Sequence, residues 1–149
     1  PQRKGGVLST GFTYSGHPVS CAAALKNIEI MEREGICANI REVGPYLERQ
    51  LKTLSHHETV GDVRGSHFML AIENVADKAS KELLPVEARV GDRVAAEAQK
   101  RGLIIRPVGH LNIISPPLIW NRDVVDRVVA ILDEAFTATT ASLRKDGYL

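Results

Sequence analysis

The most regular stretch of the chain runs from Ile36 to Leu54, with the sequence ICANIREVGPYLERQLKTL. Its apolar residues recur every three or four positions, which places them along one face of an α-helix. These residues are Ile36, Ile40, Val43, Leu47, Leu51 and Leu54. Pro45 falls inside the stripe. Because proline lacks an N–H and crowds the preceding turn, we expect a kink or a new helix start there.

Shorter patterns on both sides of this helix predict the remaining elements. Helices are expected over 19–34, over 86–101 and from Asn121, a good N-cap residue, onward, with a frayed tail after about residue 142. Short strands are expected over 60–64, 68–73, 103–106 and 111–115, the first two being an antiparallel pair or one bent strand. This order predicts a two-layer α+β domain, in which a small, mainly antiparallel sheet is covered by helices.

Composition excludes several classes of function. The chain has 149 residues, 44% of them apolar, and a net charge of +1 with both signs interspersed. This charge gives no electrostatic case for binding nucleic acid or an acidic membrane surface. Cys21 and Cys37 lack zinc spacing, and we expect both to be reduced, as in a cytoplasmic protein. The adjacent His56 and His57 are expected to be a solvated pair whose side chains point apart.

Two residues are candidates for binding negatively charged groups. Thr13 lies in a loop rich in Gly, Ser and Thr that runs into a helix start, where hydroxyl and backbone N–H groups can receive a phosphate. An ordinary capping turn is the alternative. Arg106 ends the apolar run Leu103–Ile105, so its guanidinium could face a cleft and grip a carboxylate with two hydrogen bonds. A surface salt bridge is the alternative for Arg106.

Four blocks of sequence resemble class III aminotransferases, in the family's order and spacing. The first is GFTYSGHP at residues 11–18, which is similar to the branch that passes amino groups from amines or omega-amino acids to pyruvate. The others are VGDVRG at 60–65, GLIIR at 102–106 and SPPLI at 115–119. The resemblance covers nearly the whole chain.

The resemblance implies a fold-type-I enzyme that uses pyridoxal 5'-phosphate and forms a homodimer with active sites at the subunit interface. Residues 1–18 would be the cofactor-phosphate loop at the end of its large domain, and residues 19–149 the C-terminal small domain with its connecting helix. Thr13 matches the threonine that binds the cofactor phosphate of the neighbouring subunit, and Phe12 lines the same site. Arg106 matches the arginine that holds the carboxylate of the amino acceptor. The implied substrates are a small amine and a keto acid.

In the family, the lysine that holds the cofactor and shuttles the proton lies upstream of the threonine loop, and no lysine here matches it. We therefore expect this chain by itself to be inactive. The alternative is a non-catalytic, truncated remnant that acts at most as a dimerisation module. Two departures from the family pattern stand out. Thr10 replaces a frequent histidine, and His67 replaces a glycine, which we expect to strain or reshape the turn there.

Overall fold

A computed structural model describes residues 11–149, so Thr10 lies outside the described part. The chain divides into two compact units, one ending at Gly35 and the other running from Ile36 to Leu149. The first unit contains the loop 11–17 and helix α1 (Pro18–Arg33). Pro18 suits the first turn of α1 because its missing N–H needs no partner there. The helix predicted over 19–34 is confirmed, and none of its residues is buried.

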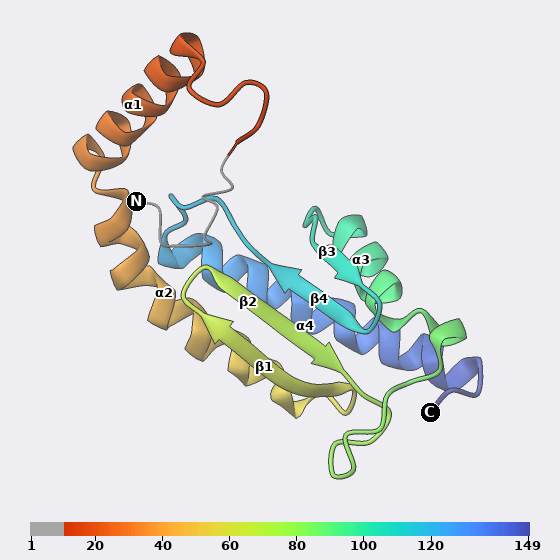
Figure 1. Cartoon of the computed structure of the whole chain (residues 1–149). Helices are drawn as coiled ribbons and strands as arrows, with labels where there is room; N and C mark the ends of the chain where they lie inside the picture. The colour runs from red at the N-terminus through yellow and green to blue at the C-terminus, as the bar shows by residue number, and fades with distance from the viewer. Residues whose placement is uncertain (1–10) are drawn as a thin grey trace, which may run out of the picture. The chain divides into compact units, whose positions relative to one another are not determined.

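The second unit is a four-stranded antiparallel sheet with helices on one face (Figure 1). The strands are β1 (Val60–Ser66), β2 (Met69–Asn74), β3 (Arg106–Val108) and β4 (Leu111–Ile114), in the spatial order β1-β2-β4-β3. The helices are α2 (Ile36–Thr53), α3 (Val90–Lys100) and α4 (Arg122–Lys145), with short 3-10 turns η1 (Leu54–His56) and η2 (Val86–Ala88). The predicted two-layer α+β class is confirmed.

The core lies between the sheet and its helices, because alternate strand residues face opposite sides. Val63, Leu70, Ile72 and Ile114 are buried, and their neighbours in the strands are more exposed. The predicted stripe of α2 supplies Val43, Leu47 and Leu51 to the same cluster, and α4 supplies Leu132 and Phe136. Asn112 of β4 is one of two buried asparagines in the sheet, the other being Asn74 of β2. The Asn112 amide donates to the Gly91 carbonyl oxygen at 2.9 Å and so ties β4 to α3.

Tertiary packing overrides the sequence pattern in two helices. The single helix predicted over 86–101 is wrong at its start, because Arg89 takes a left-handed φ of 46° between η2 and α3. This break lets Ala88 and Val90 both enter a small second core with Leu84 and Leu143. Leu143 is fully buried, so α4 continues to Lys145, and the fraying predicted after residue 142 is also wrong. The predicted N-cap is confirmed, since Asn121 Oδ1 accepts a bond from the Val124 N–H at 3.0 Å.

Three further predictions meet different outcomes in α2 and the strands. The new helix start at Pro45 is wrong, because α2 runs through Pro45, with buried residues on both sides. Strands β1 and β2 are an antiparallel pair joined at His67 and Phe68, rather than one bent strand. His67 has a φ of 50°, the left-handed region that favours glycine, so the strained turn expected there is present.

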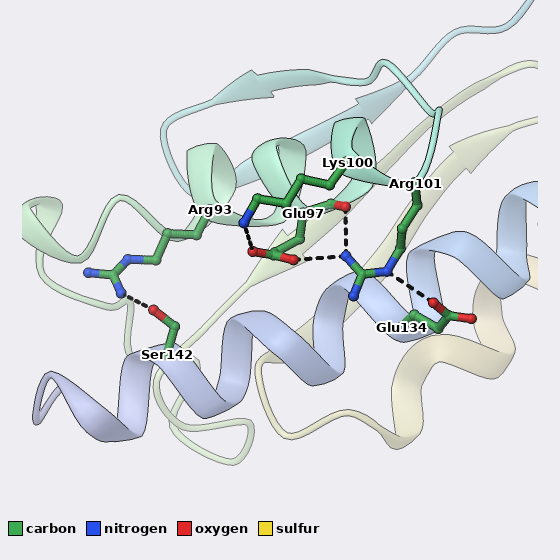
Figure 2. Close-up of polar contacts among 6 residues, drawn as sticks. All are labelled: Arg93, Glu97, Lys100, Arg101, Glu134 and Ser142. Carbon is green, nitrogen blue, oxygen red and sulfur yellow. Dashed lines mark hydrogen bonds and ion pairs between the residues drawn. The ribbon is translucent and has the colours of Figure 1, made fainter.

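Helix α3 is tied to α4 by polar contacts along their exposed edge (Figure 2). Arg101 donates to Glu97 in its own helix at 2.8 Å and to Glu134 of α4 at 3.0 Å. Lys100 also donates to Glu97, at 2.6 Å. Further along, Arg93 donates to the Ser142 hydroxyl at 2.6 Å. Hydrogen bonds from Lys100, which has the larger effect, and from Arg101 hold the pKa of the Glu97 carboxyl below its usual value.

Candidate functional site

The loop that carries Thr13 is a tight turn at the start of α1. The Phe12 N–H donates to Ser15 Oγ at 3.0 Å, and the Ser15 N–H donates back to the Phe12 carbonyl oxygen at 2.9 Å. A second turn bond joins the His17 N–H to the Tyr14 carbonyl oxygen at 3.2 Å. These bonds close the loop around Thr13, which is exposed.

No side chain caps the N-terminus of α1 in the described residues, because Ser15 is engaged within the loop and His17 makes no capping bond. The loop does form a hydrogen-bonded turn before the helix, so the alternative of an ordinary capping turn stands beside the phosphate-binding role. The first N–H groups of a helix carry partial positive charge and point outward. Hydroxyl groups and such N–H groups are both suitable donors to a phosphate, and the binding of one at Thr13 stays a prediction. The Phe12 side chain beside it is 90% exposed.

Arg106 is the first residue of the edge strand β3, opposite Ile113 of β4. The strand predicted over 103–106 is therefore placed too early, and Arg106 begins the observed strand rather than ending it. Since β3 lies at the edge of the sheet, it tolerates Pro107, which cannot donate to a ladder bond.

A hollow next to Arg106 is lined mainly by apolar side chains. They include Ile105, Ile113, Pro116 and Trp120. Among residues 11–149, no carboxylate lies within 4.0 Å of the Arg106 guanidinium, so the surface salt bridge has no partner there. Glu73 lies on β2, which is separated from β3 by β4, and is hydrogen-bonded to Arg64, which holds the Glu73 pKa below its usual value. An unpaired guanidinium at the rim of an apolar hollow can bind a small carboxylic acid by its charged end.

Thr13 belongs to the first unit and Arg106 to the second. Their meeting at one active site stays a prediction. The same holds for the domain boundary expected at residue 18. The two cysteines are free and exposed. No helix within residues 11–149 combines the length and apolar character needed to cross a membrane.

Sequence reasoning missed one cluster of potential ligand side chains. His56 and His57 do not point apart, because both Nε2 atoms approach Oδ1 of Asp133, at 3.2 and 2.8 Å. The prediction of a solvated pair is wrong because the backbone changes between the two residues from the 3-10 turn η1 to an extended conformation. Asp133 lies 76 residues after His57 on α4, so no local spacing could reveal the cluster.

Comparison with known proteins gives a consistent result. The family model described as "Aminotransferase class-III" matches residues 2–136. An uncharacterized aminotransferase of Sinorhizobium fredii is 41% identical, and the diaminobutyrate–2-oxoglutarate transaminase of Halomonas elongata is 39% identical. Each alignment covers 95% of this chain but only 31% of the relative, so the chain spans about a third of the length of these proteins.

Solved structures agree with these relatives. The omega-transferase of Vibrio fluvialis superposes with a TM-score of 0.85 at 37% identity, over 93% of this chain and 33% of that one. The (S)-enantioselective omega-transaminase of Thermomicrobium roseum gives a TM-score of 0.81 at 40% identity, over 89% of this chain and 30% of that one.

Proposed function

Since this chain belongs to the class III aminotransferases, we propose that it supplies the C-terminal part of an enzyme that moves an amino group from an amine or omega-amino acid to pyruvate. The observation that carries this proposal is Arg106, a guanidinium without a carboxylate partner in residues 11–149, at the rim of an apolar hollow. A planar guanidinium binds both oxygens of a carboxylate, and so would orient the keto acid.

The cofactor of this enzyme is pyridoxal 5'-phosphate, which supplies an electron sink for the carbon that gains or loses the amino group. The exposed Thr13 hydroxyl and the uncapped N-terminus of α1 fit the phosphate of that cofactor. By resemblance to the family, the phosphate bound here belongs to the active site of the second subunit of a homodimer, and Phe12 lines the same site. The lysine that moves the proton would come from sequence that precedes residue 1.

Pyruvate is the proposed acceptor for two reasons. One solved transaminase, 41% identical over 94% of this chain, is described as bound with L-alanine, the amino acid that pyruvate becomes. The hollow beside Arg106 also offers apolar side chains for a methyl group. The Halomonas elongata relative is instead named for 2-oxoglutarate, which carries a second carboxylate. The acceptor is therefore the feature to test first.

The test is an assay of the complete natural protein that contains this sequence, with a primary amine, pyridoxal phosphate, and either pyruvate or 2-oxoglutarate. We expect alanine to form with pyruvate, and the 149-residue chain alone to form none. Glutamate formation without alanine would overturn the choice of pyruvate. If neither product forms and no pyridoxal phosphate binds, the protein is a non-catalytic remnant, and the proposed function fails.

A further inference from the structure

Three potential metal-ligand atoms meet on the second unit, at the junction of η1 and α4. They are Nε2 of His56, Nε2 of His57 and Oδ1 of Asp133, all within 4.8 Å of one another. The two nitrogens are 3.2 and 2.8 Å from the same carboxylate oxygen. A tetrahedral ion with bonds of about 2.0–2.2 Å sets neighbouring ligand atoms about 3.3–3.6 Å apart. The His56 distance is close to this spacing, whereas His57 and Asp133, which are hydrogen-bonded to each other, would have to separate slightly to admit an ion.

The cluster is held in place by the elements around it. The His57 side chain is only 7% exposed, and its ring lies against Phe136 with ring centroids 5.5 Å apart. Asp133 is one helical turn before the Thr137 hydroxyl, which donates to the Asp133 carbonyl oxygen and fixes that part of α4. The His56 ring packs on the His57 ring at 4.0 Å. His57 is therefore already ordered, whereas the His56 and Asp133 side chains are 63% and 47% exposed and would lose some freedom on binding an ion.

The hydrogen bonds of His56 favour a cation between these groups. Its Nδ1 lies 2.9 Å from the Thr53 carbonyl oxygen, which can only accept, so Nδ1 carries the proton. In the neutral ring, Nε2 then presents a lone pair toward the Asp133 carboxylate, and two acceptors facing each other repel. A metal ion bound between the two groups would accept both lone pairs. A bond from the other ring nitrogen to a backbone carbonyl is also the usual support of a metal-binding histidine.

We propose that His56, His57 and Asp133 form a zinc site. Two imidazoles and one carboxylate suit Zn²⁺ rather than Mg²⁺ or Ca²⁺, which prefer oxygen ligands. Three protein ligands leave a fourth position, on the side of an open cavity that Glu58, Thr137 and Arg144 also line. Arg144 does not oppose the ion strongly, because its guanidinium is paired with Glu58 at 2.6 Å.

The test measures zinc binding to the 149-residue chain by dialysis against a competing chelator, followed by metal analysis. Cys21 and Cys37 are exposed and could also bind zinc, so both are replaced by serine in every sample. We expect one zinc ion per chain, and at least about a tenfold weaker affinity after His56→Gln or Asp133→Asn. Both positions are partly exposed, so the variants should fold. His110→Gln is the matched control, since His110 also faces a carboxylate, Glu73, but lacks a second histidine.

Thermal unfolding gives a second readout, because a ligand that binds only the folded chain raises its unfolding temperature. Zinc should raise that temperature in the parent and in His110→Gln, but not in His56→Gln. The inference is overturned if the parent binds no more zinc than His56→Gln. It is also overturned if His110→Gln loses as much affinity as the cluster variants. Absence of zinc binding would assign the cluster to a structural hydrogen bond between His57 and Asp133.

Discussion

At the scale of single residues, Arg106 is the side chain on which the proposed chemistry depends. Replacing it with lysine keeps the charge but removes the fork that grips both carboxylate oxygens. In the complete enzyme, we expect Arg106→Lys to raise the KM for pyruvate about tenfold, roughly 1.4 kcal/mol, and to leave the KM for an amine without a carboxylate unchanged. Steady-state kinetics with each substrate varied in turn measures both.

The control for this prediction is Arg64→Lys, on the same sheet. Arg64 is already hydrogen-bonded to Glu73, so its replacement should leave both KM values within about twofold, a change of ~0.4 kcal/mol. An equal loss in the two variants would mean that Arg106 acts through general charge, not by binding the acceptor.

His67 and Gly44 form a second pair whose coupling can be measured. The His67 ring lies so close to α2 that a methyl group at Gly44 would be 2.5 Å from its Cδ2 and 2.6 Å from its Cβ. Gly44→Ala should therefore lower the free energy of unfolding by about 1–3 kcal/mol. In a His67→Gly background the clash disappears, and alanine should be neutral or stabilise the helix by up to about 1 kcal/mol. Urea unfolding of the four variants gives the coupling, and equal effects in both backgrounds would contradict it.

At the scale of elements, the apolar stripe over 36–54 predicted α2 correctly. Its residues recur at the helical period and pack against one core, so the local pattern is sufficient. The Asn121 cap was also predictable, since the capping bond is local. The break at Arg89 was not, because it depends on Leu143, more than fifty residues away, to bury Ala88 and Val90. The strand at Arg106 was placed too early for a similar reason, since its pairing is set by β4.

The link between α3 and α4 provides a pH-dependent prediction. Hydrogen bonds from Lys100 and Arg101 lower the pKa of Glu97 in the folded chain. The charged carboxylate therefore stabilises the fold above the ordinary carboxyl pKa of 4.5, and this contribution is lost as the pH falls through the lower folded value. Because these groups are partly exposed, Glu97→Gln should cost only about 0.3–1 kcal/mol at pH 7 and less at pH 3.

Chemical unfolding at both pH values measures this difference. Glu87→Gln is the control, because Glu87 forms no ion pair within residues 11–149, and its effect should not depend on pH in the same way. A Glu97→Gln penalty that stays constant between pH 7 and pH 3 would contradict the assignment of the lowered pKa to this network.

At the scale of the whole molecule, many large apolar side chains of the chain are exposed to solvent. They include Phe12 at 90%, Ile104 at 85%, Val86 at 81%, Ile119 at 71% and Leu25 at 69% exposure. In a protein about three times as long, other sequence is available to cover them. We therefore expect the isolated 16.3 kDa chain to self-associate, with sedimentation velocity showing species larger than the monomer as concentration rises.

Ile104→Ser should reduce this association without lowering stability, because Ile104 makes no contribution to the core. A single monomeric boundary at every concentration would contradict the prediction.

The family could be inferred from sequence, because its motifs are contiguous. The meeting of residues 13 and 106 at one site stays a prediction, because the two residues belong to separate units.

The exposure of helix α1 has a consequence for how fast its amide protons exchange. Sixteen residues are close to the shortest length at which a helix persists alone in water, and none of those in α1 is buried. Amide protons along α4 and β2 should exchange with deuterium only when the whole unit opens, whereas those of α1 should be replaced far sooner. If exchange in α1 becomes slow when a second subunit or a longer polypeptide is present, the surface that covers α1 is also what stabilises it as a helix.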